Sequence, residues 1–189
     1  MPVQPAYVPP MSPELMTAEQ LLNMSIPGKQ VELVRGRLVV KEPPGYLHAT
    51  VVARLAAELV NYARAQNLGQ VVAGDPGFTL SRGPDTVRAP DVAFVQRARV
   101  PDPVPAAFAE FAPDLAVEVL SPHDRPGETL AKIGDWLNAG TRVVWVIDPA
   151  RRQARVYRQD GTEAVLSETD ALRGEDVLPG FSCPVSSIL

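Results

Sequence analysis

The chain has 189 residues, of which 46% are hydrophobic and 21% are charged, and these are the proportions of a single globular domain. Its one cysteine, Cys183, excludes an internal disulfide, and no apolar run approaches the roughly 20 residues that cross a bilayer. The formal net charge of −4 argues against an indiscriminate nucleic-acid binder, which would be basic. The first residues lack the basic and apolar regions of a secretory signal, so we expect a cytoplasmic protein without a membrane partner.

The N-terminal part of the chain has the pattern of a tail followed by a folded region. Residues 1–16 are rich in proline and show no hydrophobic periodicity, so we predict a proline-rich tail there and one domain over 17–189. Thr17 and Gln20 have the spacing of a capping box, which predicts that a short helix opens the domain. Alternating apolar residues on both sides of Arg35-Gly36 then predict a β-hairpin.

The middle of the chain changes between helical and extended patterns. Apolar residues recur at helical spacing from His48 to Arg64, which predicts a long helix. Three predicted strands follow, over about 70–80, 87–95 and 114–120.

A second helix is predicted over about 127–139, and a continuous apolar strand follows it at 142–147. Because a helix connects strand 114–120 to this strand, the crossover rule predicts that the two strands are parallel. A second hairpin is predicted around Asp160-Gly161. The predicted fold class is therefore α/β (α+β), with a central mixed sheet flanked by helices and extended by hairpins.

Two carboxylates are unusual because they lie in sequences that otherwise suit buried strands. Asp91 follows a proline inside the predicted strand 87–95, and Glu118 lies between two valines near the end of the next strand. Each has a structural explanation, since Asp91 could cap a turn and Glu118 could pair with Arg88. Together they favour a metal site, because converging carboxylates repel one another unless a cation lies between them, and oxygen ligands select Mg²⁺, Mn²⁺ or Ca²⁺.

Lys132 lies on the second predicted helix, away from its apolar stripe. That stripe consists of Leu130, Ile133 and Leu137. One interpretation of Lys132 is a solvated ion pair with Glu128, four residues earlier. The other is that this side of the helix overhangs the strand ends and brings the ammonium to the two carboxylates.

Two further polar residues precede these carboxylates in the chain. His48 begins the first long helix on its apolar side, where a packed, hydrogen-bonded histidine is the simpler interpretation. Glu32 lies on the polar side of its hairpin strand.

Several segments together resemble a bacterial family of restriction-endonuclease-like proteins of unknown function within the PD-(D/E)xK nuclease superfamily. They are Val31–Gly36, Arg88–Val92, Pro113–Pro122, Ala139-Gly140 and Val144–Pro149. The similarity covers about residues 17–182 and implies a core of helix, three strands, helix and strand. It also implies that Asp91 and Glu118 bind Mg²⁺ or Mn²⁺, with the Val119 carbonyl as a third ligand.

The chain departs from the superfamily pattern at Leu120, where the usual motif has a lysine. The resemblance therefore implies that Lys132 replaces that lysine and assists the attacking water, while Glu32 and His48 line the pocket. The activity implied is that of a metal-dependent endonuclease that hydrolyses DNA. Because cleavage of a duplex needs two active sites and most homo-oligomers are two-fold dimers, we also expect a homodimer. Two alternatives stay open: a non-catalytic nuclease-fold module that binds nucleic acid or a partner protein, and a metal-dependent hydrolase of another substrate.

Overall fold

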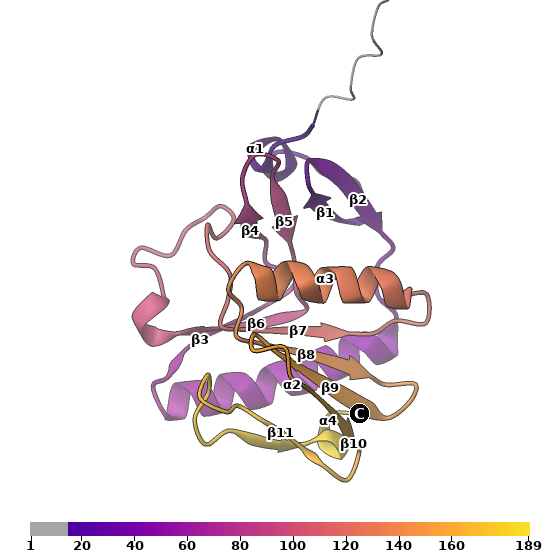
Figure 1. The fold of residues 1–189 in the computed structure, drawn as a ribbon, viewed down its shortest axis with the longest axis vertical. Coiled ribbons are helices and arrows are strands. Elements are labelled where there is room, and N and C mark those ends of the chain that lie inside the picture. The colour runs from indigo at the N-terminus through magenta and orange to yellow at the C-terminus, as the bar shows by residue number, and fades with distance from the viewer. Residues whose placement is uncertain (1–14) are drawn as a thin grey trace, which may run out of the picture.

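The computed structural model describes residues 15–189, so residues 1–14 of the predicted tail lie outside the described part (Figure 1). The helices are α1 (Ala18–Leu22), α2 (Tyr46–Ala65), α3 (Pro126–Asn138) and α4 (Val185–Ile188). The strands are β1 (Gln30–Val34), β2 (Arg37–Lys41), β3 (Gly69–Ala73), β4 (Phe78–Ser81), β5 (Thr86–Arg88), β6 (Val92–Gln96), β7 (Leu115–Val119), β8 (Val143–Asp148), β9 (Gln153–Arg158), β10 (Glu163–Ser167), β11 (Ala171–Arg173) and β12 (Ser182–Pro184). None of the helices in the described part is long and apolar enough to span a membrane.

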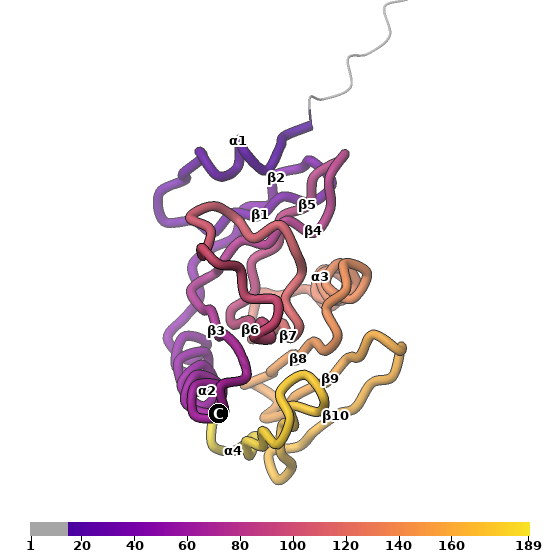
Figure 2. Tube along the Cα trace, turned by 90° about the vertical axis from the view of Figure 1, so that its left-hand side faces the viewer, coloured from indigo at the N-terminus to yellow at the C-terminus, as the bar shows by residue number. Residues whose placement is uncertain are grey.

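The central sheet has six strands in the order β10-β9-β8-β7-β6-β3. Strands β7 and β8 are parallel and are joined through α3, as the crossover rule predicts, while the other neighbouring pairs are antiparallel. Helix α2 covers one face of this sheet and α3 covers the other (Figures 1 and 2). The predicted mixed sheet flanked by helices is therefore confirmed.

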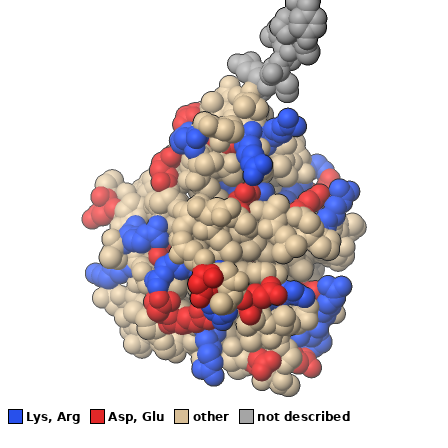
Figure 3. All heavy atoms as spheres, in the orientation of Figure 1, with Lys and Arg blue, Asp and Glu red and all other residues tan. Residues whose placement is uncertain are grey.

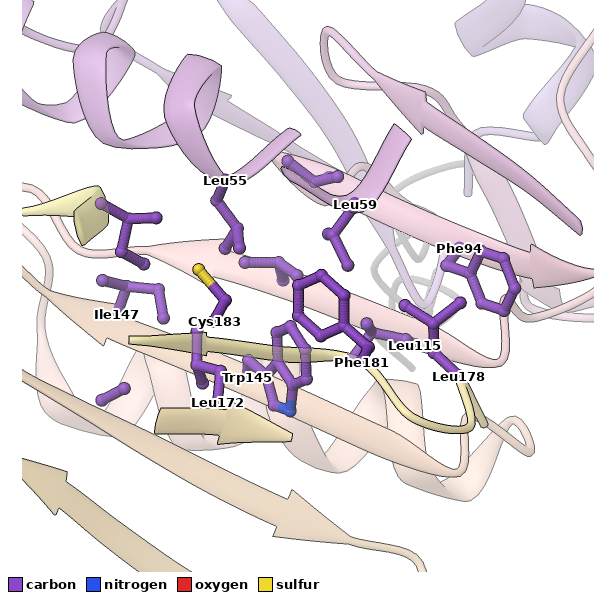
Figure 4. Packing of buried hydrophobic residues seen from close by; sticks show 14 of the residues in the cluster. Leu55, Leu59, Phe94, Leu115, Trp145, Ile147, Leu172, Leu178, Phe181 and Cys183 are labelled. Atoms are coloured by element: carbon purple, nitrogen blue, oxygen red, sulfur yellow. The ribbon is translucent and has the colours of Figure 1, made fainter. Parts of the chain in front are cut away.

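Alternation along β7 assigns its side chains to the two faces. Leu115, Val117 and Val119 pack into the larger core cluster beneath α2, whereas Ala116 packs with residues of α3. In the larger cluster Leu55 and Leu59 of α2 meet the aromatic and aliphatic side chains of the sheet (Figure 4). Full burial of each such leucine contributes about 1.5–3 kcal/mol. Glu118 lies two residues after Ala116 and therefore on the same face of the strand, so its side chain is directed to the α3 side.

A second, four-stranded sheet has the order β2-β1-β5-β4 and lies beside α3 at the N-terminal end of the molecule (Figure 1). The hairpin β1–β2 around Arg35-Gly36 is confirmed, with Leu33 opposite Leu38. The capping box is confirmed as well, because the Thr17 hydroxyl accepts from the Gln20 N–H and the Gln20 side chain accepts from the Thr17 N–H.

Two predicted strands are each divided between the two sheets. The strand predicted over 70–80 is β3 and β4, separated at Gly74–Gly77, where Gly74 and Asp75 have positive φ. The strand predicted over 87–95 is β5 and β6, separated at Ala89–Asp91. Pro90 lacks an N–H and cannot continue a ladder of hydrogen bonds, so the chain passes from one sheet to the other there.

The apolar stripe predicted for α3 is confirmed at Ile133 and Leu137, which pack into the core on that side of the sheet, and is wrong at Leu130. Leu130 is 56% exposed, and the buried side chains of the helix include Lys132, Ile133 and Trp136. Helix α3 packs on the central sheet and also lies beside the second sheet. Lys132 is buried because it pairs with Glu32 of strand β1 in that second sheet. The C-terminal elements β11, β12 and α4 were not predicted, and they complete the core beneath α2 with residues such as Leu172, Cys183 and Ile188.

Candidate functional site

Asp91 lies in the crossing between the two sheets, immediately before β6. Its N–H donates to the Val117 carbonyl (3.1 Å), and its Oδ2 accepts from the Val119 N–H (2.6 Å). Its Oδ1 lies 3.2 Å from Nε2 of His48, in the first turn of α2. The carboxylate is thus fixed to the main chain of β7 on both sides of Glu118, and it caps no local turn.

Glu118 is buried between β7 and α3. Its Oε2 accepts from Nζ of Lys132 (2.8 Å), and its Oε1 accepts from Nε1–H of Trp136 (2.9 Å). The pairing of Glu118 with Arg88 that the sequence left open is not formed. Arg88 instead donates to Glu32 and Asp135.

Lys132 projects from α3 into the space between the two sheets. Its ammonium lies 2.8 Å from Oε2 of Glu118 and 2.8 Å from Oε1 of Glu32, and it donates to the Ala89 carbonyl at 2.7 Å. The alternative of a solvated pair with Glu128 is wrong, because Lys132 is only 7% exposed and Glu128 pairs with Arg125. The structure therefore brings Lys132 to Glu118, which lies fourteen residues before it in the sequence.

Glu32 is buried, although its strand position suggested a polar, solvated side. Its Oε2 lies 2.7 Å from Nη1 of Arg88, and its Oε1 accepts from the Ala89 N–H at 3.1 Å. Arg88 also contacts Asp135 of α3 at 2.6 Å. Glu118, Lys132, Glu32, Arg88 and Asp135 consequently form one continuous chain of alternating charges that ties β7, α3, β1 and β5 together.

The two buried glutamates of this chain of charges differ in pKa. Burial opposes ionisation of Glu32, but Lys132 and Arg88 lower its pKa to about 2. Burial raises the pKa of Glu118 to about 7, and the charges of Asp91 and Glu32 add to this rise while Lys132 opposes it. The pKa of Lys132 stays above its ordinary value despite burial, because two carboxylates face the ammonium. Lys132 is therefore a permanent cation, and Glu118 would be stabilised as a carboxylate by a further cation.

Comparison with known proteins identifies the family. A family model described as "Putative restriction endonuclease" matches residues 18–186, which is almost the whole described part of the chain. The chain belongs to the Uma2 family. A "putative nuclease" from Anabaena variabilis has a similar structure, with a TM-score of 0.81 and 20% sequence identity over 92% of this chain and 97% of that chain. This Uma2-family chain therefore shares the fold of that protein, and comparison with curated proteins found no match.

His48 and Asp75 extend the charged site beyond the chain of alternating charges. Burial opposes protonation of His48, but hydrogen bonds to Asp91 and to the Val119 backbone, together with the charges of Asp91 and Asp124, raise its pKa. Asp75 lies in the turn between β3 and β4 and accepts from the Gln30 amide at 2.5 Å. Burial and the charge of Asp91 raise the pKa of Asp75. Sequence reasoning missed Asp75 because Gly74-Asp75-Pro76-Gly77 has the composition of an ordinary turn.

The oxygen donors near Asp91 are of the chemical type that a hard divalent cation takes. Asp91 and Glu118 would offer carboxylate oxygens and Val119 a main-chain carbonyl, although both oxygens of Glu118 accept hydrogen bonds from Lys132 and Trp136 in this structure. No group of three or more His, Cys, Asp or Glu side chains within residues 15–189 is arranged to hold a metal ion by itself. A cation at this site would therefore need main-chain oxygen or water as well as side chains.

Proposed function

We propose that this Uma2-family chain is a metal-dependent endonuclease that hydrolyses phosphodiester bonds of DNA. The observation that carries the proposal is the contact between Lys132 and Glu118, because it brings an ammonium to this carboxylate in a chain that has Leu120 where the superfamily motif has lysine. Family membership supports a nuclease, while the metal, the DNA substrate and the residue roles belong to the proposal.

In this proposal Asp91, Glu118 and the Val119 carbonyl hold Mg²⁺ or Mn²⁺. The bound metal would lower the pKa of a water molecule and polarise the phosphate. Lys132 orients that water and offsets the charge that develops on the phosphate oxygens. Without a bound metal, Glu118 and Glu32 raise the pKa of Lys132, so in this structure its side chain is a charged hydrogen-bond donor. Glu32 positions the ammonium, and the hydrogen bond from the Val119 N–H holds Asp91.

The surface charge bears on how DNA would bind. On the face drawn in Figure 3, the Lys and Arg side chains are interspersed with Asp and Glu instead of forming one basic surface. Together with the net charge of −4, this predicts weak, strongly salt-dependent binding to DNA in the absence of a metal. Cleavage of both strands of a duplex needs two sites, so the proposal includes a homodimer.

Digestion of supercoiled plasmid with Mg²⁺ or Mn²⁺ tests the proposal. We expect nicking or linearisation that chelation abolishes and that Asp91→Asn or Lys132→Met reduces by about a hundredfold or more. Lys29→Met is a matched control, because Lys29 pairs with Glu42 at the surface. Metal binding without cleavage of any nucleic acid would contradict the proposal and favour the non-catalytic module. Hydrolysis of small phosphoesters but not of DNA would favour a hydrolase of another substrate.

A further inference from the structure

Strand β2 is an edge strand of the second sheet, and it carries two cations on the face that is directed to α3. Arg37, Val39 and Lys41 alternate along the strand and therefore share one face. Val39 lies opposite Glu32 in the ladder between β1 and β2, and Glu32 contacts Lys132 of α3. Arg37 and Lys41 are therefore on the same face of this sheet as the glutamate of the candidate site.

The charges of Arg37 and Lys41 are not neutralised within the described part of the chain. Neither side chain forms a salt bridge with an acid among residues 15–189, whereas Lys29 nearby pairs with Glu42. Four residue steps along a strand cover about 13 Å. Two free cations at this separation on a sheet edge suit an extended polyanion, such as the phosphate backbone of a nucleic-acid strand.

An exposed aromatic side chain lies between β2 and the candidate site in the chain. Tyr46 begins α2 and is 92% exposed, which is the largest exposed fraction among the large apolar side chains of residues 15–189. His48, in the same helical turn, has its Nε2 3.2 Å from Oδ1 of Asp91. The end of β2, the start of α2 and the end of β7 lie at one edge of the molecule, on the right in Figure 1. Tyr46 therefore lies at this edge, within one helical turn of a side chain that contacts Asp91.

We propose that β2 and the start of α2 bind a single-stranded segment of the DNA substrate, with Arg37 and Lys41 on its phosphates and Tyr46 stacked on one of its bases. This inference rests on the proposed function and specifies its substrate. Stacking on a protein ring requires a base that has left the stack of a duplex, and every base offers a π-face. The preferred substrate is therefore unpaired near the cleaved bond, and the contacts are independent of its sequence.

Fluorescence anisotropy of a labelled oligonucleotide, measured without metal at low salt, tests the contact of Tyr46 with a base. We expect the single strand to bind more tightly than a duplex of the same sequence. Tyr46→Leu should weaken binding of the single strand by about fivefold or more, which is the lower end of what a stacked base contributes. Tyr46→Phe keeps the ring and should bind as the wild type does.

Replacement of both Arg37 and Lys41 by glutamine tests the phosphate contacts. The slope of log affinity against log salt concentration should become shallower by about 1.4, because each phosphate contact to a single strand contributes about 0.7. Arg155→Gln combined with Arg173→Gln is the matched control, since these arginines are also exposed and form no salt bridge in the described part. The control should leave the slope unchanged.

The possible outcomes separate this inference from the proposed function. Wild-type affinity in Tyr46→Leu, tighter binding of duplex than of single strand, or equal salt slopes in the two double variants would overturn the inference. A lower mass of Tyr46→Leu in light scattering at unchanged affinity for DNA would assign Tyr46 to an interface between copies of the chain instead. Plasmid cleavage by the wild type alongside any of these results would leave the nuclease intact. The expected binding pattern without cleavage of any nucleic acid would support the inference and contradict the nuclease.

Discussion

Replacement of Lys132 by methionine tests the charge balance on which the site depends. Methionine keeps an unbranched side chain in the same space but removes the ammonium, which contacts Glu118, Glu32 and the Ala89 carbonyl at 2.7–2.8 Å. The two carboxylates then remain buried without their shared cation.

Removal of one partner from a buried ion pair costs about 3–5 kcal/mol, which is a large part of the 5–15 kcal/mol that stabilises a typical domain. We expect a loss of this size in the free energy of unfolding at pH 8. The loss should be smaller at pH 5, because Glu118, with its pKa raised by burial and neighbouring acids, then takes up a proton and the repulsion is relieved. An additional Glu118→Gln substitution should restore part of the lost stability for the same reason.

Urea unfolding followed by tryptophan fluorescence is a suitable assay, because Trp136 and Trp145 are both buried. Lys29→Met is the control and should change the free energy of unfolding by no more than about 1 kcal/mol, as expected for a surface pair. A Lys132→Met protein as stable as this control at pH 8 would show that the two buried carboxylates do not depend on the ammonium of Lys132.

Three further predictions concern the surroundings of this lysine and the assembly. The folded-state pKa of Glu32, about 2, lies below its ordinary 4.5, so its contribution of about 3 kcal/mol is present above pH 4.5 and is lost as the pH falls through 2. Urea unfolding at several pH values should show this acid-dependent loss in the wild type but not in Glu32→Gln. An equal dependence of the free energy of unfolding on pH in the two proteins would contradict this prediction. Trp136→Phe removes the N–H that donates to Glu118 and should lower the free energy of unfolding by about 1–3 kcal/mol in the same assay. An unchanged urea midpoint would show that this hydrogen bond does not contribute to stability. Light scattering at micromolar concentration should give the mass of a homodimer, and a monomeric mass would count against cleavage by paired sites.

The parts of the fold that could be predicted are those that local patterns determine. The capping box at Thr17 and the hairpins around Gly36 and Gly161 depend on neighbouring residues alone. Strand β8 was recognisable because it is buried along its whole length and therefore continuously apolar. Asp91 and Glu118 were recognisable because they are acids within otherwise apolar strand sequences, where burial of an ionised carboxylate is costly.

The errors arise where a distant segment determines the environment. The burial of Lys132 depends on Glu32, one hundred residues earlier, so the periodicity of α3 found Ile133 and Leu137 but not Lys132. The same ion pair buries Glu32 on a strand face that looked polar. Asp91 was predicted to lie within one strand, but residues 87–95 cross from the second sheet to the central sheet. That crossing could not be predicted because β5 pairs with β1 and β6 pairs with β7, which are distant in the sequence.

Diffraction from crystals soaked in Mn²⁺, measured for the anomalous signal of the metal, tests whether Asp91 and Glu118 bind a metal ion. We expect one strong peak between the two carboxylates, at about 2.1–2.2 Å from an oxygen of each and from the Val119 carbonyl. Absence of a peak there at millimolar Mn²⁺, with Glu118 still held by Lys132 and Trp136, would contradict the proposal that these carboxylates bind a catalytic metal.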